Sequence, residues 1–317
     1  MKKLIIILVI VLGIGVLIFF RNKVAYTKID DSKDYFGISG FGPTKYPQFQ
    51  DEDVANYWKD INLYANIYGV HTTMPNIDEA AFYSTNAAMP VYLLLKDTDL
   101  ESLDNLYRIL NSNRNIVYVG IGNEINLIYK DDPFEYATFL ENAKAVFPQI
   151  KSKFKNIKLF TVFQYESLIG KGFLFGEEFE DTTTILKDWE DIVDFYGFTL
   201  YPHFDYATPS QIPEDYFNPI KQITDKDFAI TETTWPSELI DFNIEYEDFN
   251  SSEQEQKDYL DWLVKFNTTY NPKFINWLFL NDIEFGNTAF TGAALRHADG
   301  SPKIIMNEWA KLVTQNK

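Results

Sequence analysis

Eight short, apolar, β-prone runs recur along the chain, with amphipathic stretches between them. The runs are Tyr35–Gly40, Ala65–His71, Met89–Leu95, Ile116–Ile121, Lys158–Phe163, Asp194–Leu200, Asp227–Thr231 and Phe274–Leu280. Several are apolar nearly throughout, as expected where both faces of a parallel strand are buried. Helices are predicted at Glu52–Ile61, Leu100–Leu110, Pro133–Phe154, Ser251–Phe266 and Lys303–Val313.

Eight strands alternating with helices in one chain predict an α/β fold, the (β/α)8 or TIM barrel. The alternative is an open, doubly wound sheet, which usually carries a glycine-rich phosphate turn after its first strand. Here that turn reads Ser39-Gly40-Phe41-Gly42-Pro43, and Pro43 removes a backbone donor that a phosphate would need. The pattern therefore favours the barrel.

Residues 4–20 form an unbroken apolar run between Lys3 and Arg21. As a helix, this run would span roughly 25 Å, near the shortest length that crosses a bilayer. We expect a signal-anchor or transmembrane helix over 1–23, a linker over 24–33 and one barrel domain over 34–317. The alternative is a cleaved signal peptide, but no small-x-small cleavage site follows Phe20. Either segment exports the barrel, so we expect it outside the cell, membrane-anchored or secreted.

The composition excludes several classes of protein. Without cysteine the chain has no disulfide framework, thiolate metal site or cysteine nucleophile. The net charge is −18, and four basic residues lie within 1–23, so residues 24–317 carry −22. Such a surface repels nucleic acid and disfavours uronate-rich polymers. We expect a neutral polysaccharide or oligosaccharide partner, no nucleic acid and a monomer.

Two glutamates stand directly after the predicted strands four and seven, where each interrupts an otherwise apolar run. Glu124 follows Gly122-Asn123, and Glu232 follows Thr231. In a barrel, the residues after the strands meet at one face, which is where active sites lie. A carboxylate held in an otherwise apolar run is costly unless it is paired or used. Two carboxylates across a barrel mouth can flank one glycosidic bond.

These motifs resemble those of clan A glycoside hydrolases, which are TIM-barrel retaining glycosidases. Gly122-Asn123-Glu124 is similar to the clan's Asn-Glu motif. The stretch Thr231-Glu232-Thr233-Thr234-Trp235-Pro236-Ser237 resembles the nucleophile motif of family 17 β-1,3-glucan hydrolases, as Tyr201-Pro202-His203-Phe204 resembles that family's strand-six motif. The family 53 β-1,4-galactanases are a second resemblance.

The resemblance implies a role for each matching residue. Glu124 would be the general acid/base and Glu232 the nucleophile of a retaining mechanism. Asn123 would bind the sugar 2-hydroxyl, Tyr201 would hydrogen-bond Glu232, and Trp277 would form the floor of the subsite for the cleaved sugar. Further substrate-binding candidates at strand ends are His71, Gln164, His203 and Trp235.

Two positions depart from the expected patterns. Clan A members commonly carry an arginine near the end of strand two that supports the nucleophile, and only His71 stands there. Thr234 replaces a glycine of the family 17 motif. Neither departure removes a carboxylate, but both leave the sugar and the linkage open.

We expect no cofactor and no metal, because the three histidines show no ligand spacing. The alternative to a hydrolase is a non-catalytic carbohydrate-binding protein on a decayed barrel. Glutamate at both catalytic positions argues against decay. A barrel enzyme of another class, such as a lyase or an amidohydrolase, is a third possibility, although a metal-dependent amidohydrolase would need clustered histidines.

Overall fold

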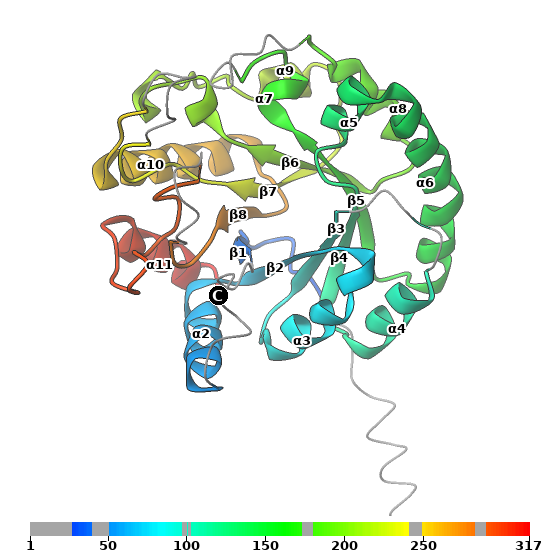
Figure 1. Ribbon diagram of the computed structural model, residues 1–317, viewed down its shortest axis with the longest axis horizontal. Helices are drawn as coiled ribbons and strands as arrows, with labels where there is room; N and C mark the ends of the chain where they lie inside the picture. The colour runs from blue at the N-terminus through cyan, green and yellow to red at the C-terminus, as the bar shows by residue number, and fades with distance from the viewer. Residues whose placement is uncertain are drawn as a thin grey trace, which may run out of the picture.

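The computed structural model of the chain describes residues 27–39, 51–96, 100, 103–172, 180–240, 249–282 and 290–317, without the side chains of 51–54. Eight parallel strands close into a barrel in chain order (Figure 1). The strands are β1 Phe36–Ser39, β2 Ile67–Thr72, β3 Val91–Leu95, β4 Ile116–Ile121, β5 Lys158–Gln164, β6 Phe195–Leu200, β7 Phe228–Thr233 and β8 Ile275–Leu278. The predicted TIM barrel is confirmed, and the open sheet is excluded.

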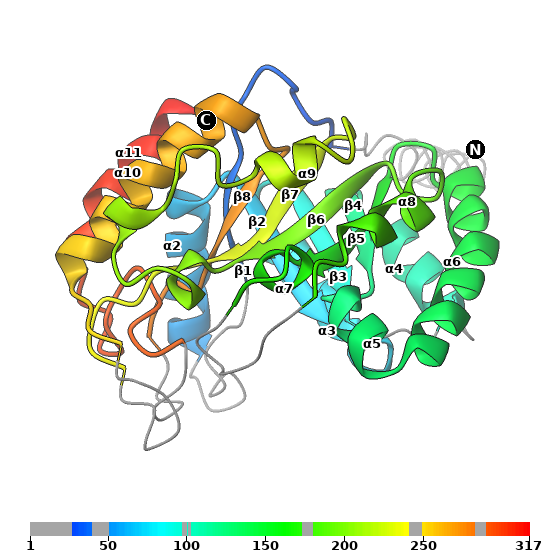
Figure 2. The ribbon, with the colours of Figure 1, turned by 90° about the horizontal axis from the view of Figure 1, so that it is seen from above.

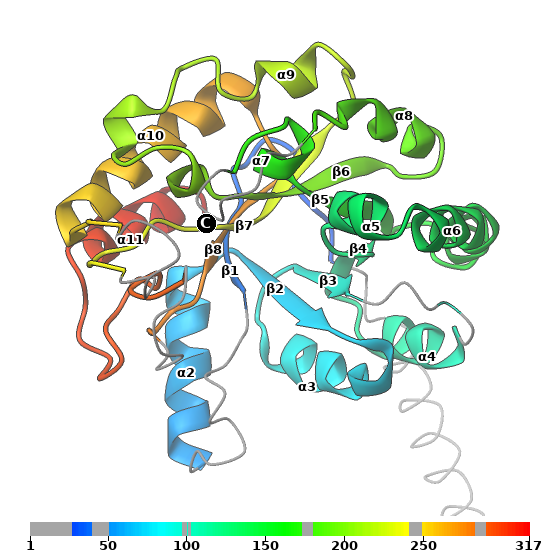
Figure 3. The ribbon, with the colours of Figure 1, turned by 45° about the horizontal axis from the view of Figure 1, so that its top comes forward.

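Helices surround the strands on the outside (Figure 3). They are α2 Asp51–Tyr64, α3 Asp78–Asn86, α4 Asp104–Ser112, α5 Ile125–Asp131, α6 Pro133–Lys153, α7 Tyr165–Leu168, α8 Leu186–Trp189, α9 Asn218–Lys221, α10 Glu253–Tyr270 and α11 Ile305–Gln315. Figure 2 shows the residues before β1 on the opposite side of the barrel from α5 and α7, which follow β4 and β5.

Local signals in the sequence fix several helix ends. Asp132 caps α6 by accepting hydrogen bonds from the backbone N–H groups of Phe134 and Glu135, and Pro133 occupies the first turn. The Ser252 side chain caps α10 in the same way. The helix α3 was not predicted, because it buries only Ala80 and Ser84 and so shows little apolar periodicity.

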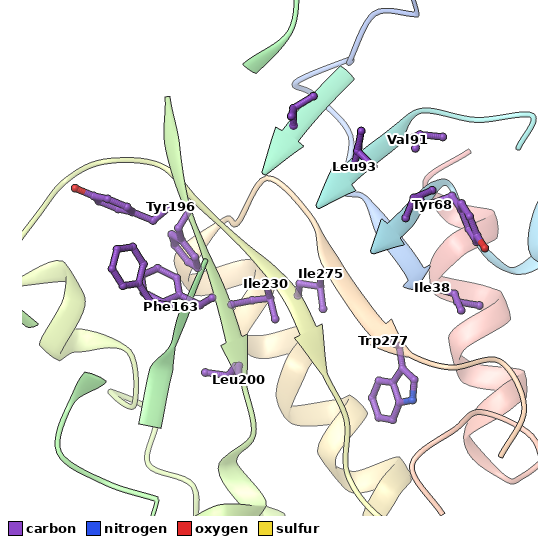
Figure 4. Packing of buried hydrophobic residues seen from close by; sticks show 14 of the residues in the cluster. Ile38, Tyr68, Val91, Leu93, Phe163, Tyr196, Leu200, Ile230, Ile275 and Trp277 are labelled. Atoms are coloured by element: carbon purple, nitrogen blue, oxygen red, sulfur yellow. The ribbon is translucent and has the colours of Figure 1, made fainter. Parts of the chain in front are cut away.

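The buried side chains form two layers, one on each side of the strands. Outward-facing residues such as Ile38, Val91, Phe163 and Ile230 pack against the helices (Figure 4). Alternate residues fill the barrel interior, mostly with large apolar groups; these include Ile67, Tyr92, Leu94, Phe160, Val162, Ala229 and Phe274. This two-residue alternation decides which side chains at the strand ends can reach the barrel mouth.

Strand β7 breaks the alternation. Phe198 of β6 pairs with Ile230, but the next residue, Thr199, pairs with Glu232, so Thr231 is an extra residue. Because of this β-bulge, each later residue of β7 points to the side of the sheet opposite to the one that regular alternation would give it. Ala229 faces the interior and Ile230 the helices, as in a regular strand. Beyond the bulge Glu232 contacts residues of the barrel mouth, and Thr233 reaches Tyr259 of α10.

The predicted membrane segment, residues 1–23, lies outside the described residues, as does most of the predicted linker. Among the helices that the structure describes, none combines the length and the apolar character needed to cross a membrane.

Gly122 allows a test of how closely the chain packs before Glu124. Its φ is +83°, and a Cβ there would meet Ile125 Cγ2 and the Phe139 ring at 2.7 Å; at Gly300, with φ +85°, a Cβ would meet nothing within 4 Å. Gly300→Ala should therefore cost only the backbone strain of about 1–2 kcal/mol. Gly122→Ala should cost about 1–3 kcal/mol more from overpacking. Denaturant unfolding of both variants measures the difference, and equal losses would contradict the packing described here.

Candidate active site

Glu232 lies at the barrel mouth with both carboxylate oxygens in contact with side chains from other strands. Tyr201, just after β6, donates a hydrogen bond from its hydroxyl to Glu232 Oε2 at 2.6 Å. His71 of β2 approaches Glu232 Oε1 with its Nδ1 at 3.1 Å, and the His71 side chain is fully buried. The Tyr201–Glu232 contact is the one predicted from the sequence, and His71 occupies the place where an arginine was expected.

These contacts keep Glu232 ionised. Burial alone would raise the pKa of its carboxyl, but the hydrogen bond and positive charge of His71, together with Lys96 and the Tyr201 hydroxyl, lower the pKa to about 2. Burial lowers the pKa of His71, and Glu232 opposes that shift. Of these two shifts, the lowered pKa of Glu232 dominates the His71–Glu232 pair, because several hydrogen-bond donors and cations surround that one carboxylate.

Glu124 is held in the opposite state. Burial, followed by the negative charge of Glu232, raises the pKa of its carboxyl to about 7, although Thr199 and Lys96 favour the ionised form. Glu124 also has a left-handed backbone, with φ 52° and ψ 43°. That conformation is unusual for a residue with a side chain and is often found at functional sites.

Thr199 shows how close Glu124 and Glu232 lie to each other. Its hydroxyl donates to Glu124 Oε1 at 2.7 Å, and its Cα is the register partner of the Glu232 Cα in the β6–β7 ladder. Neighbouring strands lie about 4.8 Å apart, and paired residues point to the same face. The two glutamates therefore share one region of the barrel mouth. The sequence predicted both just after a strand; Glu124 follows β4, but β7 runs to Thr233, so Glu232 lies within it.

A third buried carboxyl group, that of Glu166, contacts the backbone of Tyr201. Glu166 is fully buried, and its Oε1 accepts hydrogen bonds from the Tyr201 backbone N–H and the Tyr216 hydroxyl, both at 2.8 Å. Burial raises the pKa of Glu166 to about 8. Tyr201 is thus fixed at both ends, by Glu166 at its backbone and by Glu232 at its hydroxyl.

Asn123 lies beside Glu124 and is partly buried. Its Oδ1 is buried and has no hydrogen-bond partner among the described residues. A buried polar atom of this kind is costly unless a ligand or water satisfies it. Its predicted contact with a sugar 2-hydroxyl stays a prediction.

Trp277 does not have the position predicted for it. The side chain is 0% exposed, its Nε1 donates to the Ala293 carbonyl, and its indole packs on Tyr259 and Trp309. Figure 4 shows it among the outward-facing residues of the strands. Side chains of a strand alternate between its two faces, and Trp277 lies on the face that packs against the helices. The next residue, Leu278, points to the other face and packs in a cluster with Tyr201.

Three further substrate-binding candidates are buried and contact other parts of the protein. Trp235 is fully buried and donates to Ser251 Oγ, and His203 is 1% exposed among aromatic rings that include Trp235. Gln164 accepts from the Ser167 N–H and donates to Glu166, so its amide caps α7. His71, by contrast, contacts Glu232 directly.

Several residues of the site were not predicted. They are Thr199, Tyr92, Lys96 and Glu166, which contact or electrostatically influence the two glutamates or their supports. Lys96 had a visible signal, since it follows the apolar run Val91–Leu95 directly. Among the described residues no group of three or more His, Asp or Glu side chains is placed to hold a metal ion.

Comparison with known proteins supports the fold. No protein-family model and no curated protein matches the sequence. Among solved structures, the family 17 β-1,3-glucanosyltransferase of Rhizomucor miehei is similar, with a TM-score of 0.60 and 18% identity over 87% of this chain and 97% of that one. A calcium-binding mutant of Bacteroides uniformis β-glucuronidase 2 gives a TM-score of 0.61 and 14% identity over 91% of this chain.

The chain spans only 34% of the length of that β-glucuronidase, and 49% of a Ruminococcus gnavus β-glucuronidase, which matches with a TM-score of 0.57 and 14% identity. At these identities the similarity is one of fold. The chain therefore shares its barrel fold with these glycoside-active proteins, one of which belongs to family 17.

The raised pKa of Glu124 predicts how stability depends on pH. In the folded protein Glu124 keeps its proton up to about pH 7, against an ordinary value of 4.5. Stability from this group is therefore complete below about pH 4.5 and is lost as the pH rises to about 7. Glu124→Gln cannot ionise, so its free energy of unfolding should gain about 2–3 kcal/mol on the parent between pH 4 and pH 8. Parallel stability curves in urea would show that Glu124 ionises normally.

Proposed function

We propose that this protein is a retaining β-glycoside hydrolase, with Glu232 as nucleophile and Glu124 as general acid/base. The observation that carries the proposal is the contrast between two carboxyl groups at one barrel mouth. Glu232 is held ionised, with a pKa of about 2, and Glu124 is held protonated, with a pKa of about 7. Such a pair provides a nucleophile and an acid in the same pH range.

The reaction follows from these two states. In the first step the Glu124 proton passes to the glycosidic oxygen as the bond from the anomeric carbon to that oxygen breaks, while a Glu232 oxygen bonds to the anomeric carbon. In the second step Glu124, now ionised, takes a proton from water, the water oxygen attacks the anomeric carbon, and Glu232 leaves as a carboxylate. Two inversions leave the configuration unchanged.

The supporting residues have distinct tasks in this scheme. Tyr201 and His71 hold the Glu232 carboxylate in one orientation. Thr199 holds the Glu124 carboxyl at 2.7 Å, and its hydrogen bond stabilises the carboxylate that forms when Glu124 gives up its proton. Asn123 Oδ1 would accept a hydrogen bond from the sugar 2-hydroxyl, a contact that strengthens in the transition state.

A neutral β-linked glucan is the substrate we favour. One similar structure is an active-site mutant of the Rhizomucor miehei β-1,3-glucanosyltransferase in complex with laminaritriose. Other similar structures are β-glucuronidases, which suggest an anionic sugar instead. The net charge of −18 on this chain opposes an anionic polymer. We further propose that residues 4–20 anchor the enzyme in the cell membrane with its barrel outside.

A non-catalytic sugar-binding protein is the alternative. It would not need one carboxyl with a raised pKa and another with a lowered pKa at the same mouth. Buried His71 and Tyr201 keep Glu232 ionised, and a binding surface could replace both by apolar groups.

Substitution of each glutamate distinguishes their roles. Glu232→Gln should lose activity on every substrate, by about 10⁴-fold or more, because the nucleophile is gone. Glu124→Ala should still release an activated aryl leaving group, giving a burst and then slow turnover. Azide should restore the turnover rate of Glu124→Ala, because it can attack the covalent intermediate from the space that the Glu124 side chain has left. Both variants should still bind sugar.

A binding protein would show no turnover in the parent and nothing to rescue. If the parent hydrolyses a glycoside but azide fails to rescue Glu124→Ala, then Glu124 has been given the wrong role. Glu214→Ala, at an exposed position outside both motifs, is the matched control and should behave as the parent.

A substrate panel tests the sugar. The protein without residues 1–23 should release reducing sugar from β-1,3-glucan in preference to β-1,4-galactan, mannan, cellulose and an aryl β-glucuronide. A preference for the glucuronide would overturn the charge argument but would leave the two-glutamate mechanism in place.

A further inference from the structure

Tyr92 of β3 lies in the barrel interior directly below the site. Its ring stacks on Phe274 with a centroid separation of 4.5 Å, and its side chain is fully buried. Its hydroxyl lies 2.9 Å from His71 Nε2 and also donates to the Thr231 backbone carbonyl at 2.8 Å. One hydroxyl therefore contacts the imidazole that holds Glu232 and the peptide that precedes Glu232.

The single hydroxyl proton of Tyr92 constrains the protons of His71. A carbonyl oxygen can only accept, so the Tyr92 proton points to Thr231, and Tyr92 can then only accept from His71 Nε2. Nε2 must therefore carry a proton. At 3.1 Å from an ionised Glu232 oxygen, Nδ1 must carry one as well, because two lone pairs would repel. Both contacts are satisfied together only when His71 is an imidazolium.

The Thr231 carbonyl matters because Thr231 is the extra residue of the β7 bulge. The ladder to β8 also skips there, passing from Ile230–Ile275 to Thr233–Trp277. The bulge brings Glu232 to the interior face, and the Tyr92 hydroxyl donates a hydrogen bond to the carbonyl of the bulge residue, Thr231. Loss of that donor would leave a buried carbonyl unsatisfied next to Glu232.

Gly69 shows that space is kept for this hydroxyl. Gly69 lies two residues before His71 on the same face of β2, and a Cβ there would collide with the Tyr92 hydroxyl and ring carbons. No residue with a side chain fits at that position while Tyr92 keeps its place.

We propose, on the basis of the function proposed above, that Tyr92 is a positioning residue for the nucleophile. It orients Glu232 from two directions, through the His71 imidazolium at the carboxylate and through the Thr231 carbonyl at the bulge. The Tyr92–His71 pair thus takes the place of the permanent arginine charge that the sequence pattern leads one to expect.

This arrangement makes the support of Glu232 sensitive to pH. The charged groups that act on His71 are Glu232 from β7 and Lys96 after β3, and the neutral Tyr92 hydroxyl faces it from β3. When His71 loses its second proton, Nδ1–H can stay on Glu232 only if the Tyr92 proton turns from Thr231 to Nε2. The bulge carbonyl then loses its donor. Because burial lowers the pKa of His71, activity should fall as the pH rises through that lowered pKa.

Nitrogen NMR of the imidazole rings tests the proton positions without any substrate. The chain has only three histidines, and the His71 signals are those missing in His71→Gln. We expect ¹⁵N shifts typical of an imidazolium at low pH and of a neutral ring protonated at Nδ1 above the transition. An unprotonated Nδ1 at a pH where Glu232 is ionised would overturn the proposal.

Variants then test the role of the hydroxyl. Tyr92→Phe removes the acceptor for His71 Nε2–H, so the His71 transition, and the fall in kcat/KM that accompanies it, should move to lower pH, and kcat should fall about tenfold or more with little change in KM. Gly69→Ala should give the same shift by displacing the hydroxyl. Tyr118→Phe is the matched control, since Tyr118 also stacks on Phe274 inside the barrel.

The outcomes separate this proposal from the proposed function. If Tyr92→Phe keeps the pH profile and kcat of Tyr118→Phe while Glu232→Gln is inactive, the positioning role is wrong and the hydrolase assignment stands. If no glycoside is hydrolysed but the His71 transition moves in Tyr92→Phe as expected, the proton arrangement stands and the hydrolase assignment fails.

Discussion

The structure of the site depends on one buried negative charge. Glu232 is 8% exposed, and an ionised carboxylate in that position is costly unless donors and cations replace its lost hydration. Tyr201 and His71 do so by direct contact, and Lys96 contributes its charge. The same negative charge then raises the pKa of Glu124, so the two carboxyl groups differ in protonation because they are neighbours. One electrostatic arrangement thus keeps one carboxyl group ionised and the other protonated.

The sequence predicted the elements that depend on local pattern. All eight strands lie where the apolar runs placed them, with ends shifted by two residues or fewer. Because strand ends in a barrel converge on one face, the positions of Glu124, Tyr201 and Glu232 in the chain were enough to predict that they would meet. The Tyr201 contact with Glu232 was expected from a motif resemblance, and the structure contains it.

The side of the barrel wall to which an individual side chain points could not be predicted from the sequence. Trp277 was expected at the mouth, but strand alternation turns it toward α11. Glu232 reaches the mouth only because Thr231 forms a bulge, and a bulge depends on pairing with both neighbouring strands. Tyr92 is equally hidden, since its sequence context is that of a core strand residue and its role comes from hydrogen bonds to residues far away in the chain. These features arise from tertiary contacts, which no local pattern encodes.

Covalent trapping tests the central claim most directly, namely that Glu232 is the ionised nucleophile of a retaining enzyme. A 2-deoxy-2-fluoro-β-glycoside with an activated leaving group should form the glycosyl-enzyme readily and release it slowly. Mass spectrometry of the digested protein should then find one added sugar on the peptide that contains Glu232. A label on the peptide that contains Glu124, or no label while the unfluorinated glycoside is hydrolysed with inversion, would contradict the account.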